Sequence, residues 1–409
     1  MNEWRVTVHR RTFSSPSYAA DTGLAEVSDR SSLRLETALN TPAKCSFDVD
    51  GASPGAALLQ ELTTEVMAWR GEVLMFRGVV AQTQDSLSET KHTLNVVAHD
   101  YGAVLARRYL NNATTLTYTQ WDQDEIVRDL VSYATDRAGV QGPAPPPPDT
   151  FTPGSFLPLQ VRRVDPAGTP RALSGVKRDR GYEGSKSIGE AITELGATQN
   201  PVTNQTPSFE VGVTPAADTA GTDYLDVFYP LRGTTTGVVL AYGSNLSSVS
   251  RSVNSSEYSN WCRVLGQSPA TEGAPQVYAE RWNADANDVT RIPVGLWMNT
   301  DNASDVSQQN TLDEKAAGDL ERSGILRPSY SLTMRPGAEP PGLGDTVALV
   351  IRSGRLDVSA TVRVLGLTYA VGDDLAGGED IELTVGRPAL DLTQLFRKMN
   401  RDVDALARR

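Results

Sequence analysis

Residues 66–80, VMAWRGEVLMFRGVV, decide how the first part of this chain of 409 residues folds. Apolar residues dominate the stretch on both sides of Arg70 and Gly71. Glycine adopts without steric cost the positive φ that tight hairpin turns demand. The sequence therefore predicts two antiparallel strands that meet at Gly71.

Strand patterns surround this hairpin over the first hundred residues. Apolar and polar residues alternate at positions 6–9, 33–36, 45–50 and 94–98. A period of two places one side of a strand on a core and the other side in water. Short strands at this spacing are typical of a barrel or a sandwich. We predict a first β-barrel domain over residues 1–110, and leave open whether residues 235–266 return to complete it.

Three stretches after this β-rich part change to helical spacing. The first follows Asp100, whose carboxylate is placed to accept the amide hydrogens of a first turn. The second follows Asp122 in the same way. The third begins near Ser187, which forms a capping-box pattern with Glu190. These helices and the strand patterns after them predict a mixed helical insertion over residues 111–234.

A proline-rich segment interrupts the insertion at residues 141–158. It contains seven prolines, which exclude a helix interior and a central strand. The local state that they favour is polyproline II. We predict an extended surface loop or spacer here, and the alternative is a ligand for an SH3-type domain.

The last third of the chain is β-rich again. Apolar residues occupy every second position over residues 356–364, and Ser353 with Gly354 marks a turn before them. A helical pattern at residues 312–322 introduces this unit, with acidic residues early and an arginine late, as the helix dipole favours. We predict a second antiparallel β-barrel domain over residues 267–388, separate from the first.

Residues 389–409 form a predicted C-terminal amphipathic helix. Apolar side chains recur there every three or four residues. A helix this short is marginal alone in water, so we expect it to dock on its own chain, a sister copy or a partner. The interface residues that this predicts are Leu392, Leu395, Phe396, Met399 and Val403. The fold class is thus mainly β, with two antiparallel β-barrel-like domains, an α+β insertion and a C-terminal helix.

Charge and cysteine usage limit the partners and the compartment. The net charge is −12 and the sequence pI about 4.9, which disfavours phosphate backbones and anionic membranes. Apolar runs stay far below the ~20 residues of a membrane span, and the N-terminus lacks a signal-peptide pattern. We expect no stable nucleic-acid binding, no transmembrane segment, and assembly in a reducing cytoplasm with Cys45 and Cys262 as buried free thiols.

Catalytic motifs are sparse. The only histidines are His9, His92 and His99, and the sequence has no Gly-x-Ser-x-Gly elbow, phosphate-binding loop or His-Glu-x-x-His motif. His99 with Asp100 matches the metal pair of a phosphohydrolase, but such a site needs further histidines on separate helices. The capping role of Asp100 is the favoured interpretation.

Two further groups of residues could form a binding site, but each has a simpler structural explanation. Five tryptophans are candidates for a sugar-stacking platform or, as we favour, for core and interface packing: Trp69, Trp121, Trp261, Trp282 and Trp297. Residues 285–288 predict an Asx-rich turn better than a calcium loop, because the glycine and distal glutamate of such a loop are missing. We expect no catalytic residue, no cofactor and no bound metal.

Several segments together resemble the baseplate or tail-tip hub proteins of long-tailed bacteriophages, a kind of minor tail protein. LNVVAHDYGAVL at residues 94–105 resembles the strand-then-helix segment of these hubs, and GEVLMFRGVV at 71–80 resembles their strand pair that meets at a glycine. Residues 249–266 resemble the strand that returns to the first barrel, and GDTVAL at 344–349 resembles the strand entry of the second. The order of the units extends the resemblance over most of the chain.

The resemblance implies a structural virion protein. Hub chains of this kind form homotrimers, and two barrels per chain make a ring of six that adapts a sixfold tail tube to a threefold tip. The implied partners are the distal tail or tube protein, the tape-measure protein, and receptor-binding or tip proteins. The hub would gate DNA passage at host contact, through a lumen whose acidity does not trap DNA. The alternative is a cell-wall carbohydrate-binding or carbohydrate-degrading β protein of the tail.

Overall fold

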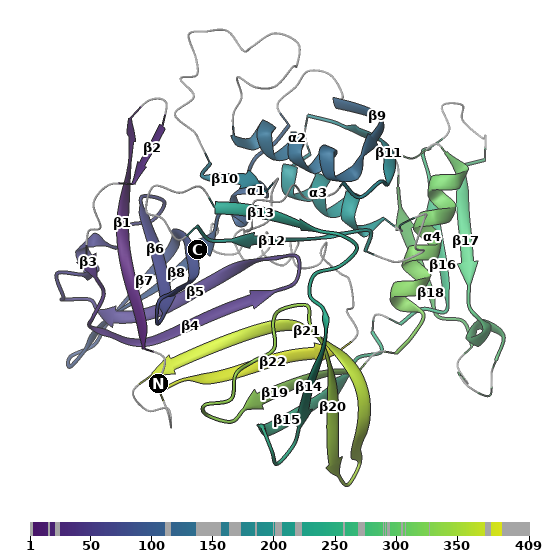
Figure 1. Cartoon of the computed structure of the whole chain (residues 1–409). Helices are drawn as coiled ribbons and strands as arrows, with labels where there is room; N and C mark the ends of the chain where they lie inside the picture. The colour runs from purple at the N-terminus through teal and green to yellow at the C-terminus, as the bar shows by residue number, and fades with distance from the viewer. Residues whose placement is uncertain are drawn as a thin grey trace.

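The computed structural model describes residues 3–14, 17–20, 25–110, 116–135, 157–162, 173–184, 186–198, 200, 207–216, 223–256, 258–268, 275–288, 290, 292, 295–303, 306, 308–326, 328–372 and 378–386. Most of the described elements are strands, and the helices lie in the middle of the chain (Figure 1). The fold class predicted from the sequence, mainly β with helical insertions, is confirmed. The predicted C-terminal helix over residues 389–409 and most of the proline-rich segment lie outside the described residues.

The first β unit has the predicted hairpin at its centre. Gly71 has a φ of 59°, and it begins the turn between β6 and β7. Pairing runs through β4, β5, β8, β7, β6 and β1, with the short β2 and β3 beside β1. The strands of this unit are β1 (Trp4–Ser14), β2 (Ser17–Ala20), β3 (Ala25–Glu26), β4 (Arg30–Ala38), β5 (Thr41–Asp50), β6 (Thr64–Arg70), β7 (Val73–Leu87) and β8 (His92–Asp100).

The second β unit is built around the long strand β21. Its strands are β14 (Thr235–Ala241), β15 (Leu246–Val253), β19 (Pro328–Met334), β20 (Thr346–Ser353), β21 (Leu356–Gly372) and β22 (Asp380–Gly386). The order is β14-β20-β21-β22-β19-β15, and the predicted turn at Gly354 joins β20 to β21. All pairs in this unit are antiparallel except β14 with β20, which are parallel.

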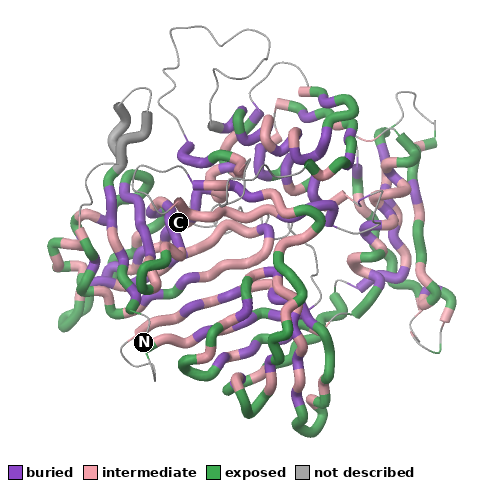
Figure 2. The backbone as a smooth tube through the Cα atoms, in the orientation of Figure 1, coloured by how far each residue is buried: buried purple, intermediate pink, exposed green. Residues whose placement is uncertain are grey.

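The two units form one continuous sheet rather than two separate cylinders. The second half of β21 pairs with β4, so that Tyr369 lies opposite Leu35. One hydrophobic cluster, which includes Phe47 and Phe76 from the first unit and Leu332 and Leu383 from the second, spans both. Figure 2 shows this burial running along the strands of both units. The described strands of the two units do not close into the barrels that the sequence predicts, and the edge of β21 pairs instead with β4 of the neighbouring unit.

Residues 235–266 do not return to the first unit. Strand β14 pairs with β20 and strand β15 pairs with β19, and both of those partners belong to the second unit. Strand β16 (Trp261–Leu265) pairs with β17 (Tyr278–Trp282) and β18 (Met298–Asn302) in a separate sheet of three strands. By strand pairing, this segment therefore belongs to the second unit and to the small three-stranded sheet, and it does not complete the first barrel.

The helical insertion has a core of its own, and its local signals are confirmed. Ser187 accepts the Glu190 amide, and the Glu190 side chain accepts the Ser187 amide, as the capping box predicts. Asp122 accepts the amide hydrogen of Asp124 at the start of α2. The elements are α1 (Gly102–Leu105), β9 (Leu116–Asp122), α2 (Gln123–Thr135), β10 (Leu159–Val161), β11 (Lys177–Tyr182), α3 (Ile188–Ala197), β12 (Glu210–Thr214) and β13 (Asp223–Phe228).

A small lobe stands beside the insertion in Figure 1. It consists of the β17-β16-β18 sheet, the short 3-10 turn at Ala284–Asn287 and helix α4 (Gln309–Ser323). The predicted helix at 312–322 is thus confirmed, but it covers this small sheet rather than the second β unit, since Leu312 and Ala316 pack on Val264 and Ala279. Among the described helices, none has the length and apolar character needed to cross a membrane.

Candidate assembly surfaces

A buried ion pair joins the insertion to the second β unit. Arg363 on β21 donates to both carboxylate oxygens of Glu210 on β12, at 2.7 and 2.6 Å. It also donates to the carbonyl oxygens of Gly344 and Arg232, at 2.9 and 2.6 Å. A buried charge pair in which all three guanidinium nitrogens donate is costly to break, because the remaining partner keeps its charge away from water.

A second buried pair joins the insertion to the first β unit. The Arg77 side chain on β7 is fully buried, and its Nε donates to Glu65 on β6 at 2.8 Å. The Tyr101 hydroxyl donates to the same carboxylate at 2.6 Å. Arg77 also reaches Asp223 on β13 at 3.4 Å. The start of β13 thus contacts the β6–β7 hairpin of the first β unit.

A third cluster closes the seam between the two β units. The Arg70 guanidinium holds Glu379, with N–O distances of 3.0 and 2.8 Å, and Trp4 donates its indole N–H to the same carboxylate. The Arg70 guanidinium also lies over the Tyr369 ring, 5.4 Å from its centre, and burial raises the pKa of Tyr369. These three clusters connect the insertion and both β units into one frame.

The small lobe presents an uncovered aromatic surface. The register places Trp261, Arg263, Tyr278, Trp282 and Met298 on the same side of the β17-β16-β18 sheet, and we call these five residues the aromatic face. Two ring contacts organise it: Trp261 and Trp282 are 5.8 Å apart, and the Arg263 guanidinium lies 5.5 Å from the Tyr278 ring centre. Trp282, Met298 and Tyr278 are each more than half exposed. Trp, Tyr, Met and Arg are the residues enriched at protein interfaces.

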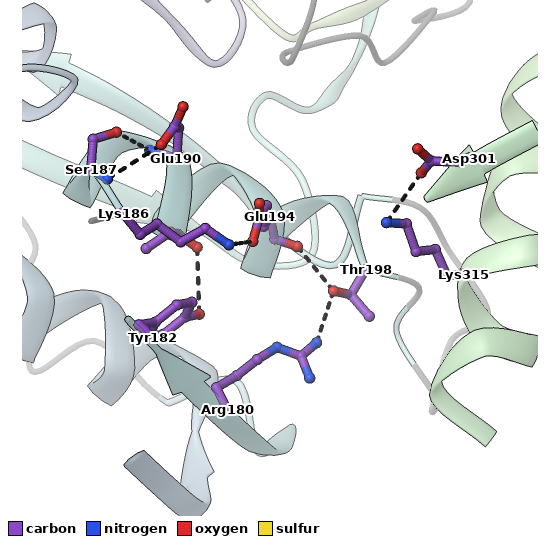
Figure 3. Close-up of polar contacts among 10 residues, drawn as sticks. Arg180, Tyr182, Lys186, Ser187, Glu190, Glu194, Thr198, Asp301 and Lys315 are labelled. Atoms are coloured by element: carbon purple, nitrogen blue, oxygen red, sulfur yellow. Dashed lines mark hydrogen bonds and ion pairs between the residues drawn. The ribbon is translucent and has the colours of Figure 1, made fainter. Parts of the chain in front are cut away.

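Helix α4 covers only the opposite side of this sheet. Ion pairs fix it there, with Lys315 at 3.1 Å from Asp301 and Arg281 at 3.4 Å from Asp313. Figure 3 shows the Lys315–Asp301 pair beyond the end of α3, where Arg180 donates to Thr198. Since α4 occupies the inner side, the aromatic face is left to solvent in the described part of the chain.

Strands β14 and β15 are the outer strands of the second β unit in the described part of the chain, and at the edge of β14 the Asn245 side chain bonds the backbone at Val239 and Ala241. Strands β14 and β15 follow each other in the chain and meet only at the bridge between Tyr242 and Leu246. Val238, Val239 and Tyr242 are exposed along this boundary. We call β14 and β15 the open edge. Exposed apolar strand edges are surfaces on which another chain can pair.

The two cysteines and Asp100, which the sequence analysis singled out, are all buried. Cys45 and Cys262 are buried free thiols as predicted, and burial raises the pKa of Cys45 to about 12. Asp100 accepts the amide hydrogens of Ala43 and Gly102, at 2.7 and 2.9 Å, so it links β8 to β5 as well as to the short helix. Burial raises the pKa of Asp100 to about 7.

The His, Cys, Asp and Glu side chains of the described residues form no group of three that could hold a metal ion. Asp285 takes part in a turn, where Asn283 accepts its amide hydrogen at 3.0 Å. The predicted interface residues Leu392, Leu395, Phe396, Met399 and Val403 lie outside the described residues, so their role stays a prediction.

Some of the predicted tryptophans pack against other side chains, and others are exposed to solvent. Trp261 and Trp282 meet on the aromatic face, whereas Trp121 lies exposed on the insertion and Trp69 stacks under Arg5 at 5.4 Å. Sequence reasoning missed the aromatic face as a unit. The alternation of Tyr278 with Trp282 was visible, but only the pairing of three strands brings the other members to it.

Comparison with known proteins identifies the fold. No protein-family model and no curated protein matches the sequence. The structure is similar to a 43 kDa tail protein of prophage MuSo2 from Shewanella oneidensis, with 12% identity, a TM-score of 0.57, and coverage of 95% of this chain and 100% of that one. It is also similar to a tail protein from Neisseria meningitidis, with 12% identity, a TM-score of 0.55, and coverage of 94% and 96%.

A third solved structure with this fold is a prophage tail protein from Listeria monocytogenes. It is 12% identical, with a TM-score of 0.50 and coverage of 98% of this chain and 99% of that one. The chain therefore has the fold of phage tail proteins along nearly its whole length. The resemblance predicted from the sequence is confirmed at this level.

Proposed function

We propose that this chain is a structural virion protein that forms the tail-tip, or baseplate, hub of a bacteriophage. The observation that carries the proposal is a fold shared end to end with three phage tail proteins. At this level of identity the likeness concerns the fold. The step to a hub rests on the surfaces described above and on the arrangement of the two β units.

The arrangement supports a threefold ring. Each chain places two β units side by side through the β21–β4 pair, and three chains would supply six units in a collar. The collar would adapt a sixfold tube to a threefold tip. In the part of the chain that the structure describes, the open edge and the aromatic face are exposed surfaces of the kind that contacts between neighbouring chains require.

The buried ion pairs support a mechanical role. Glu210, Asp223 and Glu379 each bind an arginine from another part of the fold. Because these contacts link the insertion and both β units, a force applied to one part is passed to the others. A hub that holds the tip closed and opens the channel at host contact needs such a frame.

The proposed hub would bind several other tail proteins. The predicted C-terminal helix, with Leu392, Leu395, Phe396, Met399 and Val403, would bind a sister copy or a neighbouring tail protein. The distal tail or tube protein, the tape-measure protein and tip proteins would meet the collar. The net charge of −12 suits a lumen that lets DNA pass. The proposed role is not enzymatic.

Copy number in the particle tests the proposal. Tails are purified from phage that carry this chain, and each tail protein is quantified by mass spectrometry against labelled peptide standards. We expect three copies per tail, with the tube protein at a multiple of six. One copy per tail, or absence of the chain from tails that remain infectious, would contradict the hub role.

A further inference from the structure

A hollow on the insertion lies between strand β9 and helix α2, far in the fold from the open edge. Its volume is about 570 Å³, within the range of roughly 300–1,000 Å³ that ligand sites occupy. The side chains that line it and carry the argument are Gln120, Trp121, Glu125, Arg128, Asp129 and Ser132. The hub role assigns no function to this hollow.

Helix α2 contributes a polar stripe to the hollow. Glu125, Asp129 and Ser132 recur at intervals of four and three, so they lie on one side of the helix. The other side carries the apolar residues of the insertion core, among them Ile126 and Leu130. The stripe offers carboxylate acceptors and a hydroxyl group, which can both donate and accept hydrogen bonds.

A β-bulge turns an aromatic ring toward this stripe. On β11 and β9, Arg180 pairs with Tyr118 and Arg178 pairs with Trp121, so two residues of β9 stand opposite Asp179 alone. The extra residue places the Tyr118 and Trp121 rings together, with centres 5.2 Å apart. Tyr118 is buried and donates to Asp129 at 2.7 Å, whereas Trp121 is 44% exposed.

The bulge carries local strain. Gln120 has a φ of 55°, a region that side chains other than glycine rarely adopt. Asp179 holds it there by accepting the Gln120 backbone and side-chain N–H groups, at 2.7 and 3.1 Å. Strain of this kind persists where the surroundings fix it, and it gathers at binding sites.

We propose that this hollow binds a neutral oligosaccharide built of pyranose rings. One face of a pyranose ring is made of C–H groups and stacks on an aromatic surface such as Trp121. The hydroxyl groups at its rim donate to carboxylates, which Glu125 and Asp129 supply, and accept from a hydroxyl group, which Ser132 supplies. Polar side chains close to a single exposed ring fit a ligand that is apolar on one face and polar at its edge.

Other ligand classes fit the hollow less well. Glu125 and Asp129 repel an anion, and the one cation, Arg128, already pairs with Asp124 at 2.8 Å. A lipid or another apolar ligand would strip water from these carboxylates without replacing their hydrogen bonds. The aromatic face of the small lobe is a different kind of surface, since its two indole rings are tilted by 49° and share the face with Met298 and an arginine.

Titration of the purified full-length chain with β-1,4-linked pentamers of glucose and of N-acetylglucosamine tests the proposal. Binding is measured by isothermal titration calorimetry and by ligand-observed NMR. We expect at least one pentamer to bind with a Kd of about 1 mM or tighter. Trp121→Ala is expected to weaken it about tenfold or more, and Trp121→Phe to restore part of the loss.

Two further variants separate binding from folding. Ser132→Leu changes an exposed residue and fills the hollow, so it should abolish binding while the thermal unfolding temperature stays close to that of the parent. Trp282→Ala removes an exposed indole elsewhere and should leave binding unchanged. Failure of both pentamers to bind the parent chain would overturn the proposal. Binding that survives Trp121→Ala would also overturn the proposal. The same holds if Trp121→Ala leaves pentamer binding intact and instead blocks assembly with another tail protein.

Discussion

Arg363 on β21 and Glu210 on β12 form two hydrogen bonds across 153 residues of sequence, and both side chains are buried. This pair places a strand of the insertion against a strand of the second β unit. The pair of Arg77 with Asp223 places the neighbouring insertion strand, β13, against β7 of the first β unit. Such contacts connect the insertion and both β units into one frame.

Breaking the Arg363–Glu210 pair should destabilise the whole chain. Arg363→Met leaves the Glu210 carboxylate buried without its partner, and it also removes the donors to the Gly344 and Arg232 carbonyls. We expect a loss of about 3–5 kcal/mol in the free energy of unfolding. Urea denaturation followed by circular dichroism measures this loss.

An exposed ion pair provides the control for this variant. Arg352 pairs with Asp357 in the same β unit, with both side chains more than half exposed. Arg352→Met should change the free energy of unfolding by less than about 1 kcal/mol. Equal effects of the two substitutions would contradict the role given to the buried pair.

Asp100 should make the fold less stable as pH rises. Burial raises its pKa to about 7 in the folded chain, above its ordinary value of 3.8. Between these two values the unfolded chain loses the proton and the folded chain keeps it, so stability falls as pH rises from about 4 to about 7 and then levels off. Asp100→Asn should flatten this part of the profile, by a few kcal/mol at most.

The measurement for Asp100 is the free energy of unfolding at several pH values, compared between the parent and the variant. Asp50→Asn serves as a matched control, because Asp50 is exposed and accepts the amide hydrogen of Ala52. The control should follow the parent profile. A difference between parent and Asp100→Asn that stays constant with pH would show that Asp100 does not titrate in this range.

The turn at Gly71 should resist substitution because of its backbone conformation alone. Its φ is 59°, and a Cβ atom there would meet no atom within 4 Å. Gly71→Ala should therefore cost about 1–2 kcal/mol of stability through strain. Gly237→Ala also meets open space but lies outside the positive-φ region, so it should cost less than about 1 kcal/mol in the same urea experiment. A reversed order of the two costs would contradict this explanation.

The aromatic face should matter for assembly and not for folding. Trp282 is 56% exposed, so Trp282→Ala is expected to leave the unfolding temperature nearly unchanged. It should weaken association with the neighbouring chain by about 2 kcal/mol or more, as loss of an interface hot spot does. Sedimentation of reconstituted tail tips measures this effect. Tyr109→Ala removes another exposed ring, on the insertion, and its expected result is normal assembly.

The C-terminal segment offers a separate test of assembly. Deletion of residues 390–409 should leave the two β units folded and impair formation of the tail tip. Replacement of Leu395 and Phe396 by aspartate should act in the same direction, because charge on the apolar stripe opposes docking. Electron microscopy of particles and plaque counts record the outcome. Infectious particles in normal yield from the deletion would refute the role of this segment.

Local signals in the sequence were sufficient for the turns and the helices. The hairpin at Gly71, the capping box at Ser187 and the helix at 312–322 each depend on neighbours within a few residues. Alternating patterns likewise located most strands. The mainly β class followed from these elements.

Long-range pairing was beyond the reach of the same signals. Alternation along β21 shows which residues are buried, but nothing in it indicates that one half pairs with β20 and the other with β4. For this reason the sequence did not decide whether residues 235–266 belong to the first or the second β unit. The candidate surfaces depend on the same pairings, since Trp121 owes its position to a bulge and the aromatic face to three strands.

The most direct test of the central claim is a cryo-electron microscopy map of the intact tail tip. The account predicts three copies of this chain around the tail axis, with their six β units in one collar and the acidic lumen open toward the tube. A map that places a single copy at the tip, or that places the chain off the axis as a peripheral fibre component, would contradict it.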